Sequence, residues 1–252
     1  MNRIRVNEVC QGLAGDTQHV TGIQGGMATM DETMRDSHEN VVPTSHSSYN
    51  EFKRELEQRL YDGCSVTFAV PQHAGKDDVA TEVLRDLRER GCLTAYLDLS
   101  SVNSIDEFGN ALAQTYLKLL SGDTVWSEDS IKGLLGNLSD PDVEKQIQDI
   151  VDEADLERMS AWEKVDWAVG LGERLAESLD TRLVVWFHEW QEVARMKDGD
   201  LLLKRLRGMF QLQTHVTYAF TGSRDPDLLR TLFADSHQPY YRFAVDLQFS
   251  TS

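Results

Sequence analysis

Short, continuous apolar runs alternate with longer amphipathic segments along most of the chain. The runs at 65–70, 93–99, 183–187 and 216–221 are rich in β-branched and aromatic residues, which is typical of strands buried on both faces. A further run at 243–247 is a candidate last strand. Strands of this kind, separated by helices, predict an α/β fold with a mainly parallel central sheet and helices on both faces.

The segments between these runs repeat apolar residues at helical spacing. In one of them, Phe52, Leu56 and Leu60 share a face while charged residues occupy the other. Gly91 is a typical stop signal and Asp225-Pro226 a typical start signal. On this basis we expect helices at 49–61, 76–90, 104–120, 162–179, 200–211 and 225–233.

Two parts of the chain lack such a pattern. Residues 1–47 are polar and aperiodic, and they are predicted to form a flexible N-terminal arm. Residues 121–160 are acidic and weakly periodic, and they are predicted to be an insertion with one or two short helices. The region 48–252 would then be one domain that carries this insertion.

The composition narrows the class of protein. Of the 252 residues, 40% are hydrophobic, which is enough for a substantial core, and no apolar run approaches the length of a membrane span. The N-terminus lacks the apolar core of a signal peptide. Cys10, Cys64 and Cys92 are an odd, scattered set, which favours unpaired cysteines of a reducing compartment. We therefore predict a cytoplasmic protein that does not associate with membranes.

The charge limits the partners. A formal net charge of −17 opposes direct contact with nucleic acid or an anionic membrane, because both require clustered Lys and Arg. An anionic ligand such as ATP would need a local positive site. A protein partner or a second copy of the chain is the expected alternative.

One such positive site is predicted directly after the first strand. The strand leads into a turn with Pro71 and Gly75, and Lys76 opens a helical pattern. Strand, turn, Gly-Lys and helix is the layout of a phosphate-binding P-loop. In that loop successive backbone N–H groups and the helix N-terminus surround the phosphates, and the lysine reaches the terminal oxygens.

This loop departs from the pattern G-x-x-x-x-G-K-[ST] at two positions. Val70 stands where the first glycine belongs, and Asp77 stands where a hydroxyl would bind Mg²⁺. A carboxylate there would repel the phosphate oxygens, because like charges a few ångströms apart cost on the order of several kcal/mol at intermediate dielectric. A divalent ion that bridges the carboxylate and the phosphate could offset this cost. The alternative reading is that Gly75 is a turn residue and Lys76 a solvated lysine.

A second motif follows the third apolar run. P-loop ATPases end such a strand in Asp-Glu, in which the aspartate holds Mg²⁺ and the glutamate activates the attacking water. Here Glu189 is in place, but His188 stands at the aspartate position. Mg²⁺ prefers oxygen ligands, so a hydrogen-bonded, partly buried histidine is the alternative reading for His188. A surface carboxylate is the alternative for Glu189.

A third motif follows the fourth run. Thr221 and Ser223 are candidates to sense a terminal phosphate, and Arg224 adds positive charge. A turn with a hydroxyl cap is the alternative reading. In open parallel sheets, ligands bind beyond the carboxyl ends of the strands. We therefore expect the segments 71–77, 188–191 and 221–224 to converge at one edge of the sheet.

The order of these blocks resembles the archaeal-type ATPases of the AAA+/STAND group of P-loop proteins. In that family the loop reads Gly-Pro-Arg-Arg-x-Gly-Lys-Thr, the strand end Asp-Glu-Phe-Gln, and later blocks Thr-Gly-Ser and Pro-Phe-Tyr-Arg-Phe. The resemblance covers about residues 49 to 245. The matching blocks are Val70-Pro71-x-x-x-Gly75-Lys76, Tyr96-Leu97-Asp98-Leu99, His188-Glu189-Trp190-Gln191, Phe220-Thr221-Gly222-Ser223, Leu232-Phe233 and Pro239-Tyr240-Tyr241-Arg242-Phe243.

The resemblance implies a P-loop NTPase fold and assigns roles by position. Glu189 and Lys76 would be catalytic, and Asp77 would be the metal ligand. The nucleotide would contact Pro71, Gln72, His73, Ala74, Gly75, Lys76, Asp77, Asp78 and Ser223. ATP and Mg²⁺ are possible but not required, because Val70, Asp77 and His188 depart from the family's pattern. The resemblance covers only the P-loop domain, and we expect no counterpart in these 252 residues of the helical lid and winged-helix domain that usually follow in the family.

Three functions remain open on this basis. The first is a degenerate P-loop module with weak or no ATP hydrolysis that serves as a protein-binding or assembly scaffold. The second is an active ATPase in which Asp77 replaces the usual metal ligands. The third is an α/β domain that shares only descent with the family and binds no nucleotide.

Overall fold

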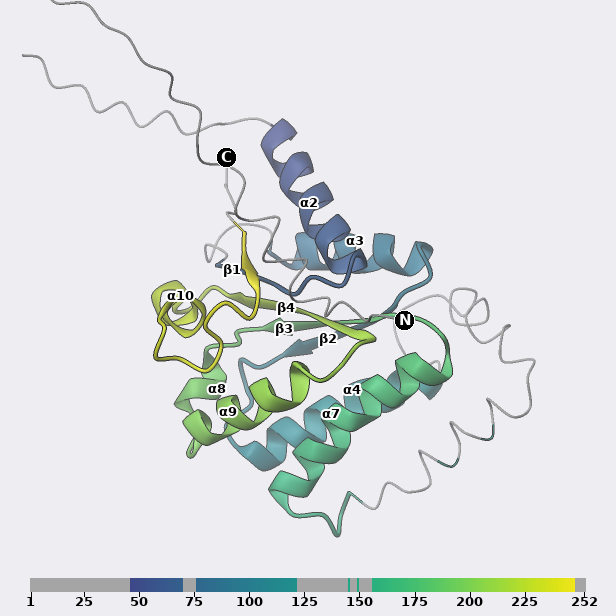
Figure 1. Cartoon of the computed structure of the whole chain (residues 1–252), viewed down its shortest axis with the longest axis vertical. Helices are drawn as coiled ribbons and strands as arrows, with labels where there is room; N and C mark the ends of the chain where they lie inside the picture. Colours follow the sequence, from purple (N-terminus) through teal and green to yellow (C-terminus); the bar gives the residue numbers. More distant parts are fainter. Residues whose placement is uncertain (1–45, 70–75, 122–144, 146–148, 150–155, 248–252) are drawn as a thin grey trace, which may run out of the picture.

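The computed structural model describes residues 46–69, 76–121, 145, 149 and 156–247 (Figure 1). Its centre is a sheet in the order β2-β3-β4-β1-β5, in which every neighbouring pair is parallel. The strands are β1 Val66–Ala69, β2 Leu93–Asp98, β3 Leu183–His188, β4 Val216–Gly222 and β5 Val245–Asp246. The predicted fold class, an α/β fold with a parallel sheet, is confirmed.

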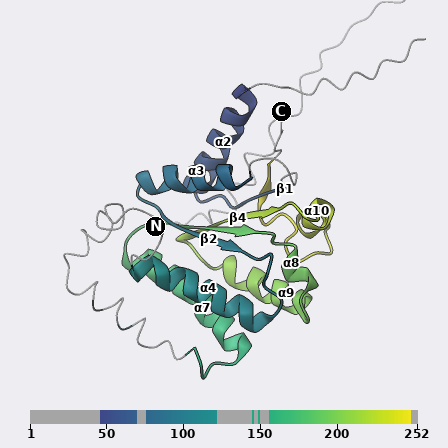
Figure 2. The same ribbon diagram turned by 180° about the vertical axis from the view of Figure 1, so that it is seen from behind.

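Helices cover both faces of the sheet, as Figure 1 and the reverse view in Figure 2 show. They are α2 His46–Tyr61, α3 Lys76–Glu89, α4 Ile105–Ser121, α7 Ala161–Ser178, α8 Glu192–Arg195, α9 Gly199–Phe210 and α10 Pro226–Ala234. Each of the six predicted helices is present within three residues at either end. The short helix α8 was not predicted, because four residues are too few to show a helical period.

Two hydrophobic clusters lie on the two faces of the sheet. On one face α2 and α3 pack against side chains of β1 and β3 such as Phe68 and Trp186. On the other face α4, α7, α9 and α10 pack against side chains such as Val185, Phe187 and Phe220. Alternate residues of β3 thus enter different clusters, which explains why this strand reads as a continuous apolar run.

Local signals fix where several helices begin. Ser160 caps α7 in a capping box, in which Ser160 and Glu163 each bind the other's backbone N–H. Asp225 caps α10 by accepting a hydrogen bond from the Leu228 N–H at 3.0 Å, and Pro226 follows at the first helical position. Only three residues therefore separate the end of β4 from the start of α10, so the intervening turn is short.

The strand order creates a switch point between β1 and β4. These strands are neighbours, with Ala69 opposite Gly222 at their carboxyl ends. Helix α3 leaves β1 toward one face, whereas α10 leaves β4 toward the other. Connections that diverge in this way mark the position where open α/β sheets bind their ligands.

Several predictions concern residues outside the described ranges. These are the N-terminal arm up to residue 45 and most of the acidic insertion, so both stay predictions. Cys92 is buried and free, but Cys64 is disulfide-bonded, so the prediction of unpaired cysteines is wrong for Cys64. In the described part of the chain, no helix has both the length and the apolar character needed to cross a bilayer.

Candidate functional site

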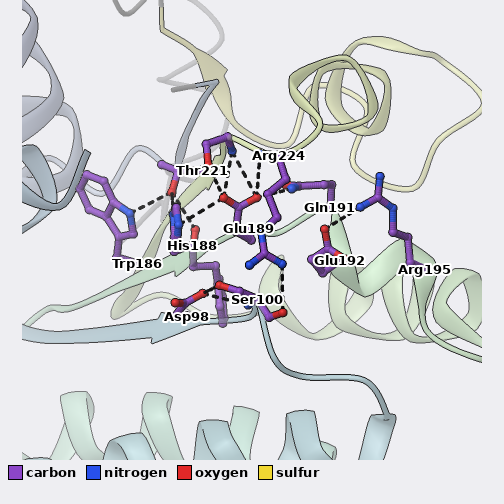
Figure 3. A network of polar contacts seen from close by, with 12 residues as sticks. Asp98, Ser100, Trp186, His188, Glu189, Gln191, Glu192, Arg195, Thr221 and Arg224 are labelled. Carbon is purple, nitrogen blue, oxygen red and sulfur yellow. Dashed lines mark hydrogen bonds and ion pairs between the residues drawn. The ribbon is translucent and has the colours of Figure 1, made fainter. Parts of the chain in front are cut away.

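The site is organised by the way β3 ends. The strand stops at His188, and Glu189 adopts a left-handed backbone conformation with φ of 56°. A residue other than glycine in this region carries strain, which the surrounding contacts must offset. Here the next N–H, that of Trp190, donates to the Thr221 carbonyl at 3.0 Å. The turn holds the Glu189 carboxylate against the carboxyl end of β4 (Figure 3).

Five donor groups surround the Glu189 carboxylate, and we call them the donor cage. The backbone N–H of Ser223 lies 3.2 Å from both carboxylate oxygens, and the Ser223 hydroxyl donates to Oε1. The Arg224 N–H donates to Oε2 at 3.1 Å, and Gln191 Nε2 donates to the same oxygen. His188 Nε2 lies 3.3 Å from Oε1. The side chain of Glu189 is only 1% exposed.

These hydrogen bonds decide the charge state of Glu189. Burial by itself would raise the pKa of the carboxyl group, because it disfavours the ionised form. The hydrogen bonds from Ser223, Gln191 and the Arg224 backbone favour the ionised form, and their combined effect lowers the pKa of Glu189 below its ordinary value. At neutral pH Glu189 is therefore a carboxylate whose two oxygens are both engaged inside the protein.

His188 directs both of its ring nitrogens toward neighbours within the sheet. Nδ1 lies 3.4 Å from the Thr221 hydroxyl, which also accepts a hydrogen bond from Trp186 Nε1 at 3.1 Å. Because Nε2 faces a carboxylate oxygen of Glu189, we assign its proton to Nε2. His188 therefore acts as a donor to Glu189 and as a link between β3 and β4, which agrees with the hydrogen-bonded alternative given above.

Gln191 lies between the donor cage and the switch point. Its side chain is fully buried, and its Oε1 atom has no hydrogen-bond partner among the residues that the structure describes. This oxygen lies against Gly222, where an added Cβ would approach it to 2.1 Å. A glycine at the end of β4 is thus required by the close approach of Gln191, and not by its backbone dihedral angles.

Arg224 extends the site to the end of β2. Its Nη1 donates to the Ser100 carbonyl at 3.2 Å, while its backbone N–H binds Glu189. Asp98, the last residue of β2, accepts hydrogen bonds from the backbone N–H of Ser100 at 2.8 Å and from its hydroxyl. The carboxyl ends of β2, β3 and β4 are therefore connected by side chains, as Figure 3 shows.

The structure brings together two of the three predicted segments. Residues 188–191 and 221–224 meet at the carboxyl edge, as expected. The loop residues Pro71, Gln72, His73, Ala74 and Gly75 lie outside the described residues, and the third segment was predicted to come from this loop. Their predicted role in binding nucleotide stays a prediction.

Helix α3 begins at the predicted position. Lys76 is its first residue, with Asp77 and Asp78 next, and the helix follows the end of β1 at Ala69 by only a short connection. The side chains of these three residues are not described. The predicted roles of Lys76 on phosphate and of Asp77 on a metal therefore also stay predictions.

The described residues do not offer Mg²⁺ a set of ligands. Mg²⁺ prefers oxygen ligands, whereas the ring nitrogens of His188 face Thr221 and Glu189. Both oxygens of Glu189 already accept hydrogen bonds from the cage. Among the described residues, no three His, Cys, Asp or Glu side chains cluster in an arrangement that could hold a metal ion.

Comparison with solved structures identifies the architecture. A Walker-type ATPase of Pyrococcus abyssi matches with a TM-score of 0.53 and 16% sequence identity, over 86% of this chain and 55% of that protein. The ORC1 protein of Aeropyrum pernix, solved in complex with DNA, matches with a TM-score of 0.51 and 16% identity, over 83% of this chain and 47% of that one. The fold is that of the P-loop ATPases.

These matches show the fold of this chain and nothing finer. The chain spans about half the length of both solved structures. No protein-family model matches it, and no curated protein matches it in sequence. The donor cage lies at the edge of the sheet where open α/β folds bind their ligands.

Three residues of the site were not given a role from the sequence. Gln191 and Asp98 belong to the quoted blocks, but only the structure shows that Gln191 binds Glu189 and that Asp98 fixes Ser100. Ser100 had no signal beyond its position after the second strand. Arg224 was proposed as a local charge, whereas the contact that holds Glu189 comes from its backbone N–H.

Proposed function

We propose that the chain is a degenerate P-loop module of the STAND type that binds a nucleoside triphosphate at the switch point and hydrolyses it slowly or not at all. The P-loop ATPase fold and the start of α3 at Lys76 support a phosphate site beside β1. A helix N-terminus that follows a strand and a Gly-Lys pair is suited to phosphate.

One observation carries the proposal of weak hydrolysis. Glu189 stands where a water-activating glutamate is expected, but its carboxylate is buried and accepts hydrogen bonds from four groups, with His188 Nε2 a further 3.3 Å contact. A general base needs a free lone pair within reach of the attacking water. In this geometry Glu189 fixes the ends of β3 and β4 to each other instead.

The second part of the proposal is a scaffold role with a protein partner or a second copy of the chain. A module that binds nucleotide without turnover can act only through the conformation or the surface that it presents to a partner. The net charge of −17 disfavours nucleic acid as that partner. Light scattering after size exclusion, with and without ATP, tests self-association as the simplest form of this role.

The first experiment is a calorimetric titration with ATP, with and without Mg²⁺. We expect micromolar affinity that Lys76→Ala abolishes, because the lysine would be the main cation for the terminal phosphates. Lys204→Ala is the matched control, since Lys204 is exposed on α9. Equal binding by both variants, or no binding by the wild type at any metal concentration, would overturn nucleotide binding at this site.

A single-turnover hydrolysis assay tests the rest of the proposal. We expect little or no phosphate release, with no further loss in Glu189→Gln. Turnover that Glu189→Gln abolishes would instead favour the active ATPase in which Asp77 supplies the metal ligand. If the site is eroded and not replaced, the double variant Asp77→Thr with His188→Asp should bind nucleotide more tightly than the wild type. Asp77→Thr removes a carboxylate that repels phosphate, and His188→Asp supplies an oxygen ligand for Mg²⁺.

A further inference from the structure

The donor cage has the composition of an anion-binding site. It presents two successive backbone N–H groups, from Ser223 and Arg224, together with the Ser223 hydroxyl, the Gln191 amide and the His188 Nε2–H. Successive N–H groups that converge on one point are a recurring device for binding carboxylate and phosphate oxygens. Nothing in these five donors is specific to a carboxylate that belongs to the same chain.

The occupant is a side chain held under strain. Glu189 reaches the cage only through its left-handed backbone conformation at φ of 56°. The hydrogen bonds of the cage lower the pKa of its carboxyl group in spite of burial, so the site favours the ionised form. Its position also matters, because Ser223 directly follows Gly222, which pairs with Ala69 at the switch point.

We propose that the donor cage is an oxyanion-binding cradle that Glu189 occupies from within, and that an external oxyanion can take the place of the Glu189 carboxylate. The external anion has the chemistry of a carboxylate or of a terminal phosphate, with two or three oxygens that each accept from N–H or O–H donors. The cage would thus report the arrival of an anion by releasing Glu189.

The identity of the natural anion rests on the proposed function. If a nucleoside triphosphate binds beside β1, the neighbouring strand end is the carboxyl end of β4, which Ser223 and Arg224 directly follow. The phosphate then competes with Glu189 for the same N–H groups. A released Glu189 loses its hydrogen bonds to β4, so anion binding is coupled to the contact between β3 and β4. Release alone does not make Glu189 a base, because a general base must also be held within reach of the attacking water, and the cage contacts that fixed its position are then lost.

Chemical rescue tests the cradle without any nucleotide. In Glu189→Ala the donors remain but the carboxylate is absent. We expect formate to raise the melting temperature of this variant saturably, by at least about 4 °C over chloride at equal ionic strength, because it binds only the folded state. In the wild type the same salts should give equal melting temperatures, since the cradle is already filled.

A double variant, Glu189→Ala with Ser223→Ala, is the matched control, because it removes the hydroxyl donor from the cradle. Its response to formate should be at least about tenfold weaker in apparent affinity, as expected for the loss of one charge-assisted hydrogen bond. An equal response of the single variant, the double variant and the wild type would overturn the cradle.

Should Glu189→Ala not fold in either salt, Glu189→Gln takes its place. An amide puts a donor where the cage requires an acceptor. Hydrogen exchange at the amides of Ser223 and Arg224 should then speed up by about tenfold relative to wild type. Unchanged protection in Glu189→Gln would contradict the preference for an anion.

A titration of the wild type separates this inference from the proposed function. ATP and inorganic phosphate are added in turn while the amide resonances of Ser223 and Arg224 are followed by NMR. Resonances that shift with ATP support displacement of Glu189 by a terminal phosphate, and shifts with phosphate alone point to a free anion. Calorimetric ATP binding with unmoved Ser223 and Arg224 resonances would overturn the displacement and leave the proposed function standing.

Discussion

At each end of β4, a glutamate carboxylate contacts backbone N–H groups, a hydroxyl and a histidine ring, but the surroundings of the two carboxylates differ. At the amino end, Glu173 of α7 accepts hydrogen bonds from the Thr214 N–H at 2.9 Å, the Thr214 hydroxyl, and the N–H and ring Nδ1 of His215. At the carboxyl end, Glu189 binds a hydroxyl residue, the following N–H and an imidazole in the same way. Each glutamate thus binds two successive backbone N–H groups beside the strand.

The two ends differ in access to water. The Glu173 side chain is 21% exposed and its histidine partner 37%, whereas the corresponding values for Glu189 and His188 are 1% and 8%. Glu173 also extends from a regular helix, while Glu189 requires a left-handed backbone. We call the Glu173 contacts, which hold α7 to the start of β4, the clamp. The clamp and the Glu189 cradle are built from the same kinds of donor, and they differ in that the cradle is buried and lies beside the switch point.

The largest loss of stability is expected when the Glu189 carboxylate is removed from the buried, carboxyl end of β4. Glu189→Ala removes the carboxylate that the five donors of the cage surround, at a site where the Glu189 side chain is only 1% exposed. We expect the free energy of unfolding to fall by about 3 kcal/mol or more, because several buried donors lose their acceptor together. Urea denaturation measures this loss, and a loss below about 1 kcal/mol would mean that water enters the cage freely.

The next largest loss of stability is expected when a side chain is added at Gly222, at the same end of β4. In Gly222→Ala the new Cβ meets the buried Oε1 of Gln191 at 2.1 Å, so the variant should lose about 1–3 kcal/mol. Gly208→Ala on α9 is the control, because nothing lies within 4 Å of its added Cβ, and it should gain about 0.5–1 kcal/mol. Partial recovery in Gly222→Ala with Gln191→Ala would locate the clash at Gln191.

Removing the Glu173 carboxylate from the exposed, amino end of β4 should cost less stability. In Glu173→Ala, water can reach the Thr214 and His215 donors, so only about 0.5–1.5 kcal/mol of unfolding free energy should be lost. Formate should not raise the melting temperature of this variant as it does for Glu189→Ala. A rescue of equal size at both ends would show that burial does not distinguish the clamp from the cradle.

Acid titration gives the smallest and most specific effect. Burial raises the pKa of Glu173, but its hydrogen bonds to Thr214 and His215 lower the pKa overall, as they do for Glu189. A lowered pKa contributes stability above about pH 4.5, the ordinary value, and that stability is lost as the pH falls through the lowered pKa.

The matching variant is Glu173→Gln, which has no carboxyl group to titrate. Stability curves between pH 5 and 3 should therefore show a shallower acid slope for it, by at most about 1.4 kcal/mol per pH unit, the value for one proton. Curves of equal slope for wild type and Glu173→Gln would place the acid sensitivity elsewhere in the molecule.

Much of the fold could be read from the sequence, because the strands are buried on both faces. Leu183, Val185 and Phe187 enter one cluster and Val184 and Trp186 the other, so the run is continuous and its meaning unambiguous. The weakest prediction was the last strand, where only Val245 and Asp246 pair with β1. The strand order itself left no signal in the sequence, because it depends on which helices cover which face.

The site was predictable in location but not in its contacts. The carboxyl ends of parallel strands share one edge, so residues 188–191 and 221–224 had to meet. The direction in which Glu189 points depends on a single left-handed residue, and no local sequence signal marks it, since glutamate rarely adopts that conformation. The unpartnered oxygen of Gln191 and the need for Gly222 follow from that same turn.

The place of β1 in the sheet also has a consequence for synthesis of the chain on the ribosome. Both neighbours of β1, β4 and β5, come much later, and the hydroxyl of Ser65 before β1 accepts from Tyr218, 153 residues further on. At a translation rate of roughly 5–20 residues per second, the first strand therefore waits on the order of ten seconds for its partners. During that interval α2 and α3 are the elements that can shield its apolar side chains, so a chain that lacks α2 should aggregate while it is being made.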